Sequence, residues 1–159
     1  ENVLCEIKPL SGDIGIDEPI ICTVKNGFVG EVYNKVSNPP AAGSEADKLL
    51  QSIIGAEIEA DKMLEKGVFT AEKAASYKKH ARSIGELGIG LNPAAMITGN
   101  MLEDEKAFKT CHFAIGSNYD NDGESFIHLD GVVRNPTIVI HYKDGSSFVV
   151  EKEGILQDL

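Results

Sequence analysis

Two β-rich segments, 19–25 and 28–33, flank the dipeptide Asn26-Gly27. Both central residues of a type I′ turn have positive φ, which Asn and Gly adopt at less cost than other residues. The spacing therefore predicts a two-residue β-hairpin whose register is fixed by the turn. A second hairpin is expected near the end of the chain, at 136–150, around Lys143-Asp144-Gly145.

Helix signals follow the first hairpin. Ser44, with Asp47 three positions later, is close to the capping-box pattern, and apolar residues then recur every three or four positions to about Glu65. Gly67 ends this predicted helix, and Thr70 caps a second one. Further strands are expected at 2–10, at 83–91 and around each of two histidines, with a short helix at 101–108. Together these elements predict an α+β fold, with a mixed or antiparallel sheet, hairpins, and two central helices packed on one side.

The size and charge of the chain narrow the classes of function. With 159 residues, 42% of them hydrophobic, we expect a single domain over 1–159. A net charge of -10 without a basic patch argues against nucleic-acid binding, and the apolar runs are too short to span a membrane. Three widely spaced cysteines fit reduced thiols in a cytoplasmic protein. Because residue 1 is Glu and not Met, we expect the chain to be a piece of a longer protein.

Three residues in the second half of the chain form a potential metal-ligand set: His112, His128 and Asp130. Side chains of a strand alternate between its faces, so His128 and Asp130 would project from the same face. A neighbouring strand carrying His112 would complete two imidazoles and one carboxylate, a set that suits divalent zinc, cobalt, manganese or ferrous iron. Either histidine by itself is more often an ordinary hydrogen-bonded residue than a metal ligand, and it is the combination with Asp130 that raises the metal-binding interpretation to an equal footing.

Glu86 is the other unusual residue, because it lies in an apolar, glycine-rich segment with Gly85, Gly88 and Gly90. Burial of an uncompensated carboxylate is costly, so we expect Glu86 to have a partner. The glycines permit a close approach of another backbone or side chain.

These motifs resemble the metal-binding half of the aminopeptidase T (leucyl aminopeptidase) family of two-metal exopeptidases. The resemblance covers about 18–140 and includes the order and spacing of Glu86, His112, His128 and Asp130, with Tyr119 seven residues after His112. It implies that the first four residues bind metal, that Glu86 also serves catalysis as a bridging ligand, and that Tyr119 lines the site and polarises the substrate. It further implies zinc, cobalt or manganese as cofactor, a peptide substrate and a homodimer.

The sequence departs from that family in two respects. The family has a further metal-ligating glutamate upstream, and although Gly30-Glu31-Val32-Tyr33 is similar to its motif, the segment lies inside the predicted hairpin, so Glu31 is not assigned. The stretch between His112 and His128 is also short for the family. We therefore expect the C-terminal metal-binding domain of a longer metallo-aminopeptidase, and leave open the activity of this chain alone.

Two other functions remain open. His112, His128 and Asp130 also form the two-histidine, one-carboxylate set of mononuclear non-haem iron enzymes, and the ring-cleaving dihydroxypyridine dioxygenases look similar in this region. A non-catalytic domain stabilised by metal is the third possibility. Oxygen-dependent turnover with iron(II) would favour the dioxygenase. If removal of the metal lowered the stability of the protein without loss of any reaction, the non-catalytic domain would be favoured.

Overall fold

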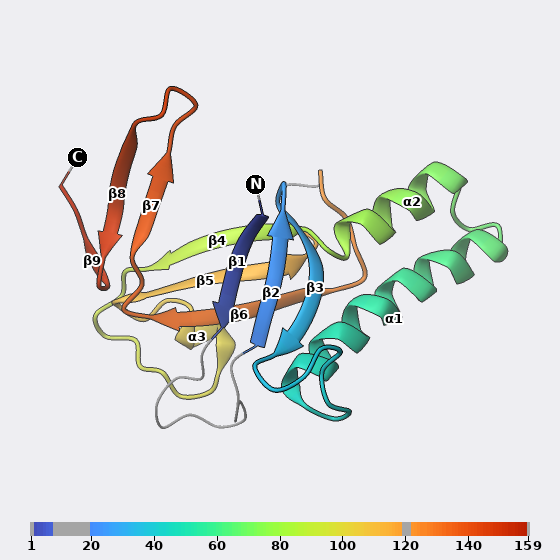
Figure 1. Ribbon diagram of the computed structural model, residues 1–159, viewed down its shortest axis with the longest axis horizontal. Helices are drawn as coiled ribbons and strands as arrows, with labels where there is room; N and C mark the ends of the chain where they lie inside the picture. The colour runs from blue at the N-terminus through green and yellow to red at the C-terminus, as the bar shows by residue number, and fades with distance from the viewer. Residues whose placement is uncertain (1, 8–19, 119–121, 159) are drawn as a thin grey trace. The chain divides into compact units, whose positions relative to one another are not determined.

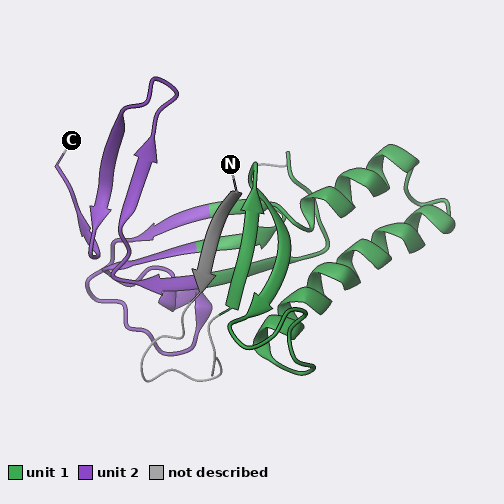
Figure 2. Ribbon diagram, viewed as in Figure 1, with its two compact units in different colours: residues 1–86, 113–131 green, residues 87–112, 132–159 purple. Residues whose placement is uncertain are grey.

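The computed structural model describes residues 2–7, 20–118 and 122–158 and has an α+β fold, as predicted (Figure 1). The described part contains three three-stranded sheets, with strand orders β1-β2-β3, β4-β5-β6 and β7-β8-β9. The chain divides into two compact units, unit 1 with residues 1–86 and 113–131, and unit 2 with residues 87–112 and 132–159 (Figure 2). The expectation of a single domain stays a prediction.

The predicted Asn26-Gly27 hairpin is present in unit 1. Strands β2 (Ile20–Lys25) and β3 (Phe28–Asn34) pair antiparallel, with Lys25 opposite Phe28. The two turn residues have φ values of 52° and 80°, both in the left-handed region that the turn requires. Strand β1 (Asn2–Ile7) adds to the other edge of β2. The turn chemistry thus determines this sheet locally.

Both predicted helices are confirmed. Helix α1 (Glu45–Glu65) begins after Ser44, whose side chain accepts a hydrogen bond from the backbone N–H of Asp47 at 3.2 Å. Helix α2 (Ala71–His80) begins in the same way after Thr70. Gly67, with φ of 71°, lies in the turn after α1. Each cap satisfies a backbone donor that the first helical turn leaves unpaired, which stabilises a helix by about 1 kcal/mol.

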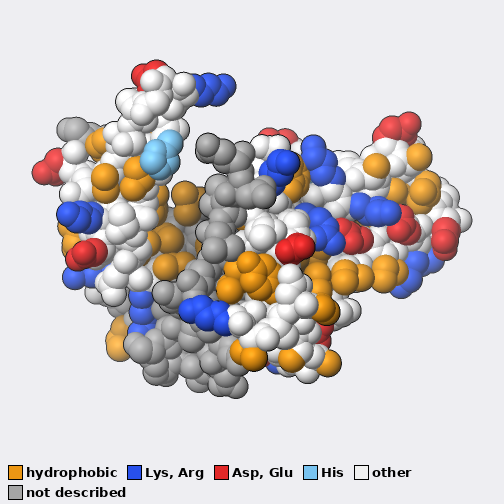
Figure 3. Space-filling model, in the orientation of Figure 1, with side chains coloured by type: hydrophobic (Ala, Val, Ile, Leu, Met, Phe, Trp, Pro, Cys, Tyr) orange, Lys and Arg blue, Asp and Glu red, His pale blue; other side chains and the backbone are white. Residues whose placement is uncertain are grey.

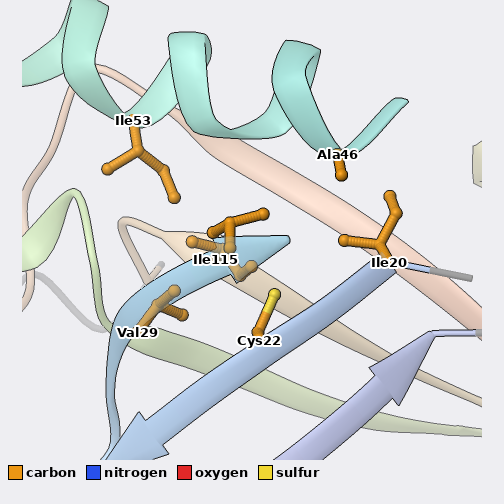
Figure 4. Packing of buried hydrophobic residues seen from close by; sticks show 7 residues of the cluster. Ile20, Cys22, Val29, Ala46, Ile53 and Ile115 are labelled. Carbon is orange, nitrogen blue, oxygen red and sulfur yellow. The ribbon is translucent and has the colours of Figure 1, made fainter. Parts of the chain in front are cut away.

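The core of unit 1 lies between α1 and the first sheet. Ile53 and Ala46 of α1 point towards Cys22 and Val29 of the sheet and Ile115 of β5 (Figure 4). Ile53 is fully buried. Burial of one such side chain contributes about 1.5–3 kcal/mol. The face of α1 and α2 that is visible in Figure 3 carries both acidic and basic side chains. Lys78 of α2 forms an ion pair with Asp61 of α1.

Hydrogen bonds connect the hairpin to the strands that bear the candidate ligands. In unit 1 the N–H of Ile84, at the start of β4 (Ile84–Gly90), donates to the carbonyl of Gly27 at 2.8 Å. The carbonyl of Ser83 accepts a hydrogen bond of 2.9 Å from the N–H of Gly116, the last residue of β5 (Thr110–Gly116). The hydroxyl of Ser83 donates to the carbonyl of Gly116 at 2.6 Å. These bonds place Glu86 and Ser117 on backbone that the core supports.

Unit 2 differs from the sequence expectation in two places. The helix expected at 101–108 is the single turn α3 (Met101–Asp104), because the carbonyl of Lys106 and the N–H of Phe108 form hydrogen bonds with Asn92 instead of continuing the helix. The C-terminal hairpin of β7 (Ile138–His141) and β8 (Ser147–Lys152) is confirmed. A further strand, β9 (Ile155–Leu156), follows the hairpin beyond its predicted range of 136–150, because Glu153 and Gly154 adopt positive φ and reverse the chain.

Candidate metal centre

His128 is the first residue of β6 (His128–Arg134), and its ring is oriented by a backbone carbonyl. Its Nδ1 atom lies 2.7 Å from the carbonyl oxygen of Ser117. A carbonyl oxygen only accepts hydrogen bonds, so Nδ1 carries a proton and donates it. In the neutral ring, Nε2 then presents a lone pair, as in metal-binding histidines whose other nitrogen donates to a carbonyl.

Two carboxylates face that Nε2 atom. Oδ1 of Asp130 lies 3.2 Å from it and Oε2 of Glu86 lies 3.5 Å from it. Ligands about 2.0–2.1 Å from one tetrahedral metal ion are about 3.3–3.4 Å apart. Each of the two carboxylate oxygens, both in unit 1, is therefore about as far from Nε2 as a second ligand of the same cation would be.

The Asp130 carboxylate supports this interpretation. Its Oδ1 atom is buried and has no hydrogen-bond partner among the described residues, so the 3.2 Å contact with His128 lacks hydrogen-bond geometry. A buried carboxylate oxygen without a donor is costly, and a cation compensates it directly. The donor set and its burial both fit a divalent ion.

Gly116 and Ser117 connect the histidine to β5. The N–H of Ser117 donates to the carbonyl of Ile127 at 2.8 Å, while the Ser117 carbonyl accepts from the next residue, His128. A Cβ on Gly116 would lie 2.0 Å from the same Ile127 carbonyl, and Gly116 has φ of 121°. Only glycine permits this approach, which holds the His128 ring in its orientation.

Unit 2 contains the other predicted histidine ligand. His112 of β5 is buried, with 5% of its surface exposed, and its Nε2 atom lies 3.9 Å from Oε2 of Glu105. The ring packs directly over Gly88 of β4, where a Cβ would lie 2.0 Å from Cε1 of the ring. The glycine spacing noted in the sequence therefore makes room for an imidazole.

The outcome for the predicted site residues is mixed. In unit 1 the carboxylates of Glu86 and Asp130 each lie near Nε2 of His128, so Glu86 has a partner in His128, and their role as metal ligands stays a prediction. The joining of His112 to this group stays a prediction, because His112 lies in unit 2. Tyr119 lies outside the described residues.

Sequence analysis missed two contributors. Ser117 acts through its backbone carbonyl, which has no side-chain signature. Glu105 follows Glu103 and Asp104 in an acidic run that reads as a solvated helix end, and nothing in its spacing links it to His112. Glu105, His112 and Asp130 each offer an atom of the kind that ligates metals.

Comparison of the chain with known proteins gave no match to any family model, curated protein or solved structure. Within the described residues, none of the helices combines the length and the apolar character needed to cross a membrane.

Proposed function

We propose that this chain binds a divalent transition-metal ion through Glu86, His128 and Asp130, and that it is the metal-binding part of an aminopeptidase. The observation that carries the proposal is the His128 ring: Nδ1 donates to a carbonyl, and Nε2 faces two carboxylate oxygens at 3.2 and 3.5 Å. A histidine whose Nδ1 donates to a carbonyl while Nε2 faces carboxylate oxygens has the arrangement of a metal-binding histidine beside its fellow ligands.

The donor types favour zinc, cobalt or manganese. Glu86 gives the group a second carboxylate, whereas the iron oxygenases use two histidines and one carboxylate. One imidazole and two carboxylates are the ligands of several hydrolytic metal sites. The additional carboxylate therefore supports the peptidase over the dioxygenase.

A metal ion bound here would acidify a water molecule and polarise a substrate carbonyl, as in known metallohydrolases. The chain's own residues contribute position and charge. The Ser117 carbonyl holds the His128 ring, and Gly116 permits the backbone approach behind it. The net charge of -10 favours a cationic group such as the α-ammonium of a peptide N-terminus, which is the group that an aminopeptidase recognises.

Metal binding is tested first, with chain purified without chelator and analysed for metal content. Zinc, cobalt or manganese is expected, and its removal with EDTA should lower the melting temperature. Binding at 100 times the dissociation constant stabilises by about 2.7 kcal/mol, or about 5–10 °C for a chain of this length. Unchanged melting with zinc, cobalt and manganese would contradict the metal site.

The reaction is tested separately on leucyl amide substrates, with the metal-loaded chain. We expect metal-dependent release of leucine, abolished by the His128→Ala change. Metal binding without hydrolysis would leave the metal site standing and contradict the peptidase. Oxygen consumption with iron(II) and a dihydroxypyridine would instead support the dioxygenase.

A further inference from the structure

Glu105 and His112 face each other in unit 2 at a distance that a hydrogen bond does not explain. Nε2 of His112 lies 3.9 Å from Oε2 of Glu105, beyond the range of about 2.7–3.2 Å for N–H···O bonds. Two ligands with bonds of about 2.0–2.2 Å to one tetrahedral ion lie about 3.3–3.6 Å apart, slightly closer than these two atoms are. The separation therefore accommodates a cation between the two atoms, with little movement of either.

Burial limits how far either side chain can move. The side chains of His112 and Glu105 are 6% and 14% exposed. The backbone of Gly88 lies against the His112 ring and leaves no room for even a methyl group. Both donor atoms are thus held in place in largely water-excluded surroundings, which suits a metal site better than a solvated ion pair.

The position of Glu105 is fixed by the turn that precedes it. Its backbone N–H caps α3, and Asp104 beside it accepts hydrogen bonds from the N–H groups of Thr98 at 2.7 Å and Gly99 at 3.0 Å. Lys106 pairs with Oε1 of Glu105, so the oxygen that faces His112 is Oε2. Oε1 of Glu105 thus forms an ion pair with an exposed lysine, and Oε2 faces the imidazole of His112.

We propose that Glu105 is a metal ligand and binds a divalent cation together with His112. The alternative is an ordinary charged pair in which the imidazole is protonated. The type of ion is taken from the proposed function, and to that extent the inference rests on it. The contacts that support the inference lie wholly in unit 2. It adds a carboxylate ligand that no motif in the sequence indicated.

The test is a zinc titration of the full chain with ¹⁵N-labelled histidine, followed by NMR of the ring nitrogens. The chain has four histidines, so single His→Asn variants assign them, and the exposed His141 serves as an internal reference. We expect the Nε2 resonance of His112 to shift on zinc addition. The resonance of His128 reports the proposed function independently in the same spectra.

Glu105→Gln removes the proposed ligand with almost no change in size and should weaken zinc binding, read at His112, by at least tenfold. Glu103→Gln is the matched control, since Glu103 lies in the same turn and is exposed, and it should titrate like the parent. With Co²⁺ in place of zinc, Glu105→Gln should also change the visible absorption spectrum, which responds to the ligand set and not to ring orientation alone. Should Glu105→Gln fail to fold, Glu105→Asp keeps the carboxylate with a shorter reach and should bind with intermediate affinity.

Each outcome separates the two proposals. A shift at His128 but not at His112 overturns this inference and leaves the proposed function intact. A shift at His112 alone supports the inference and overturns the site of unit 1. A Glu105→Gln variant that matches the parent in affinity and in its Co²⁺ spectrum overturns the role of Glu105.

Discussion

Oδ1 of Asp130 lies 3.2 Å from Nε2 of His128, two residues earlier on the same strand. The strand repeat alone brings these two donors to one face, so a two-ligand arrangement requires no long-range contact. The oxygen is buried and has no hydrogen-bond donor among the described residues, so a bound cation would compensate its burial.

Replacement of either member of this pair should abolish tight metal binding. For His128→Ala and Asp130→Ala we expect affinity losses above about 100-fold, more than the loss of an outer hydrogen-bond partner of a ligand causes. The far-UV circular dichroism should stay close to that of the parent, because both side chains lie outside the hydrophobic core of unit 1. Elemental analysis provides the measurement, with the exposed His141→Ala as control. Equal metal content in the variants and the parent would refute the assignment.

Gly116→Ala should destabilise the fold and weaken metal binding together. The added Cβ would meet the Ile127 carbonyl at 2.0 Å, and the φ of 121° is strained for alanine. We expect a loss of more than about 2 kcal/mol in the free energy of unfolding, measured by urea denaturation. A stability equal to that of the parent would show that the Gly116 backbone tolerates a side chain.

Gly55→Ala should stabilise the fold, in contrast to Gly116→Ala. Gly55 lies in the interior of α1, and a Cβ there meets nothing within 4 Å. Alanine is favoured over glycine in a helix by about 0.5–1 kcal/mol. The same denaturation experiment should therefore give a gain of that size with unchanged metal affinity. A loss of stability would contradict the placement of Gly55 in a helix interior.

Glu151 of β8 should make the stability of the protein fall as the pH rises. Its side chain is buried, and Oε2 has no hydrogen-bond partner among the described residues. Burial raises the pKa of the carboxyl above 4.5, so the folded chain retains this proton to higher pH than the unfolded chain. The contribution of Glu151 to stability is therefore full below the unfolded pKa, decreases between the two pKa values, and is at its least favourable above the folded one.

Glu151→Gln removes this ionisation and should stabilise the protein relative to the parent at pH 8 but much less at pH 4. Urea denaturation at both pH values measures the difference. If the variant differs from the parent equally at the two pH values, the buried carboxyl does not titrate as proposed.

Much of the fold could be predicted because its signals are local. Asn26-Gly27 determines a turn by its own φ preferences, and Ser44 and Thr70 satisfy donors within three residues of themselves. The His128–Asp130 pair follows in the same way from strand alternation. The two-residue strand β9 was missed because its turn, Glu153-Gly154, lacks the usual Asn or Asp.

The rest of the site depends on contacts between distant parts of the chain. The sequence predicted a partner for Glu86, because a carboxylate in an apolar segment is costly to bury, but only tertiary structure decided that His128, 42 positions later, lies beside it. The Ser117 carbonyl selects the protonated nitrogen of His128, although every residue has such a carbonyl and no sequence pattern distinguishes this one. The approach of Glu105 to His112 likewise requires the single turn α3 and the bare backbone of Gly88. Local preferences are thus encoded residue by residue, whereas the geometry of a site arises only when separate segments pack together.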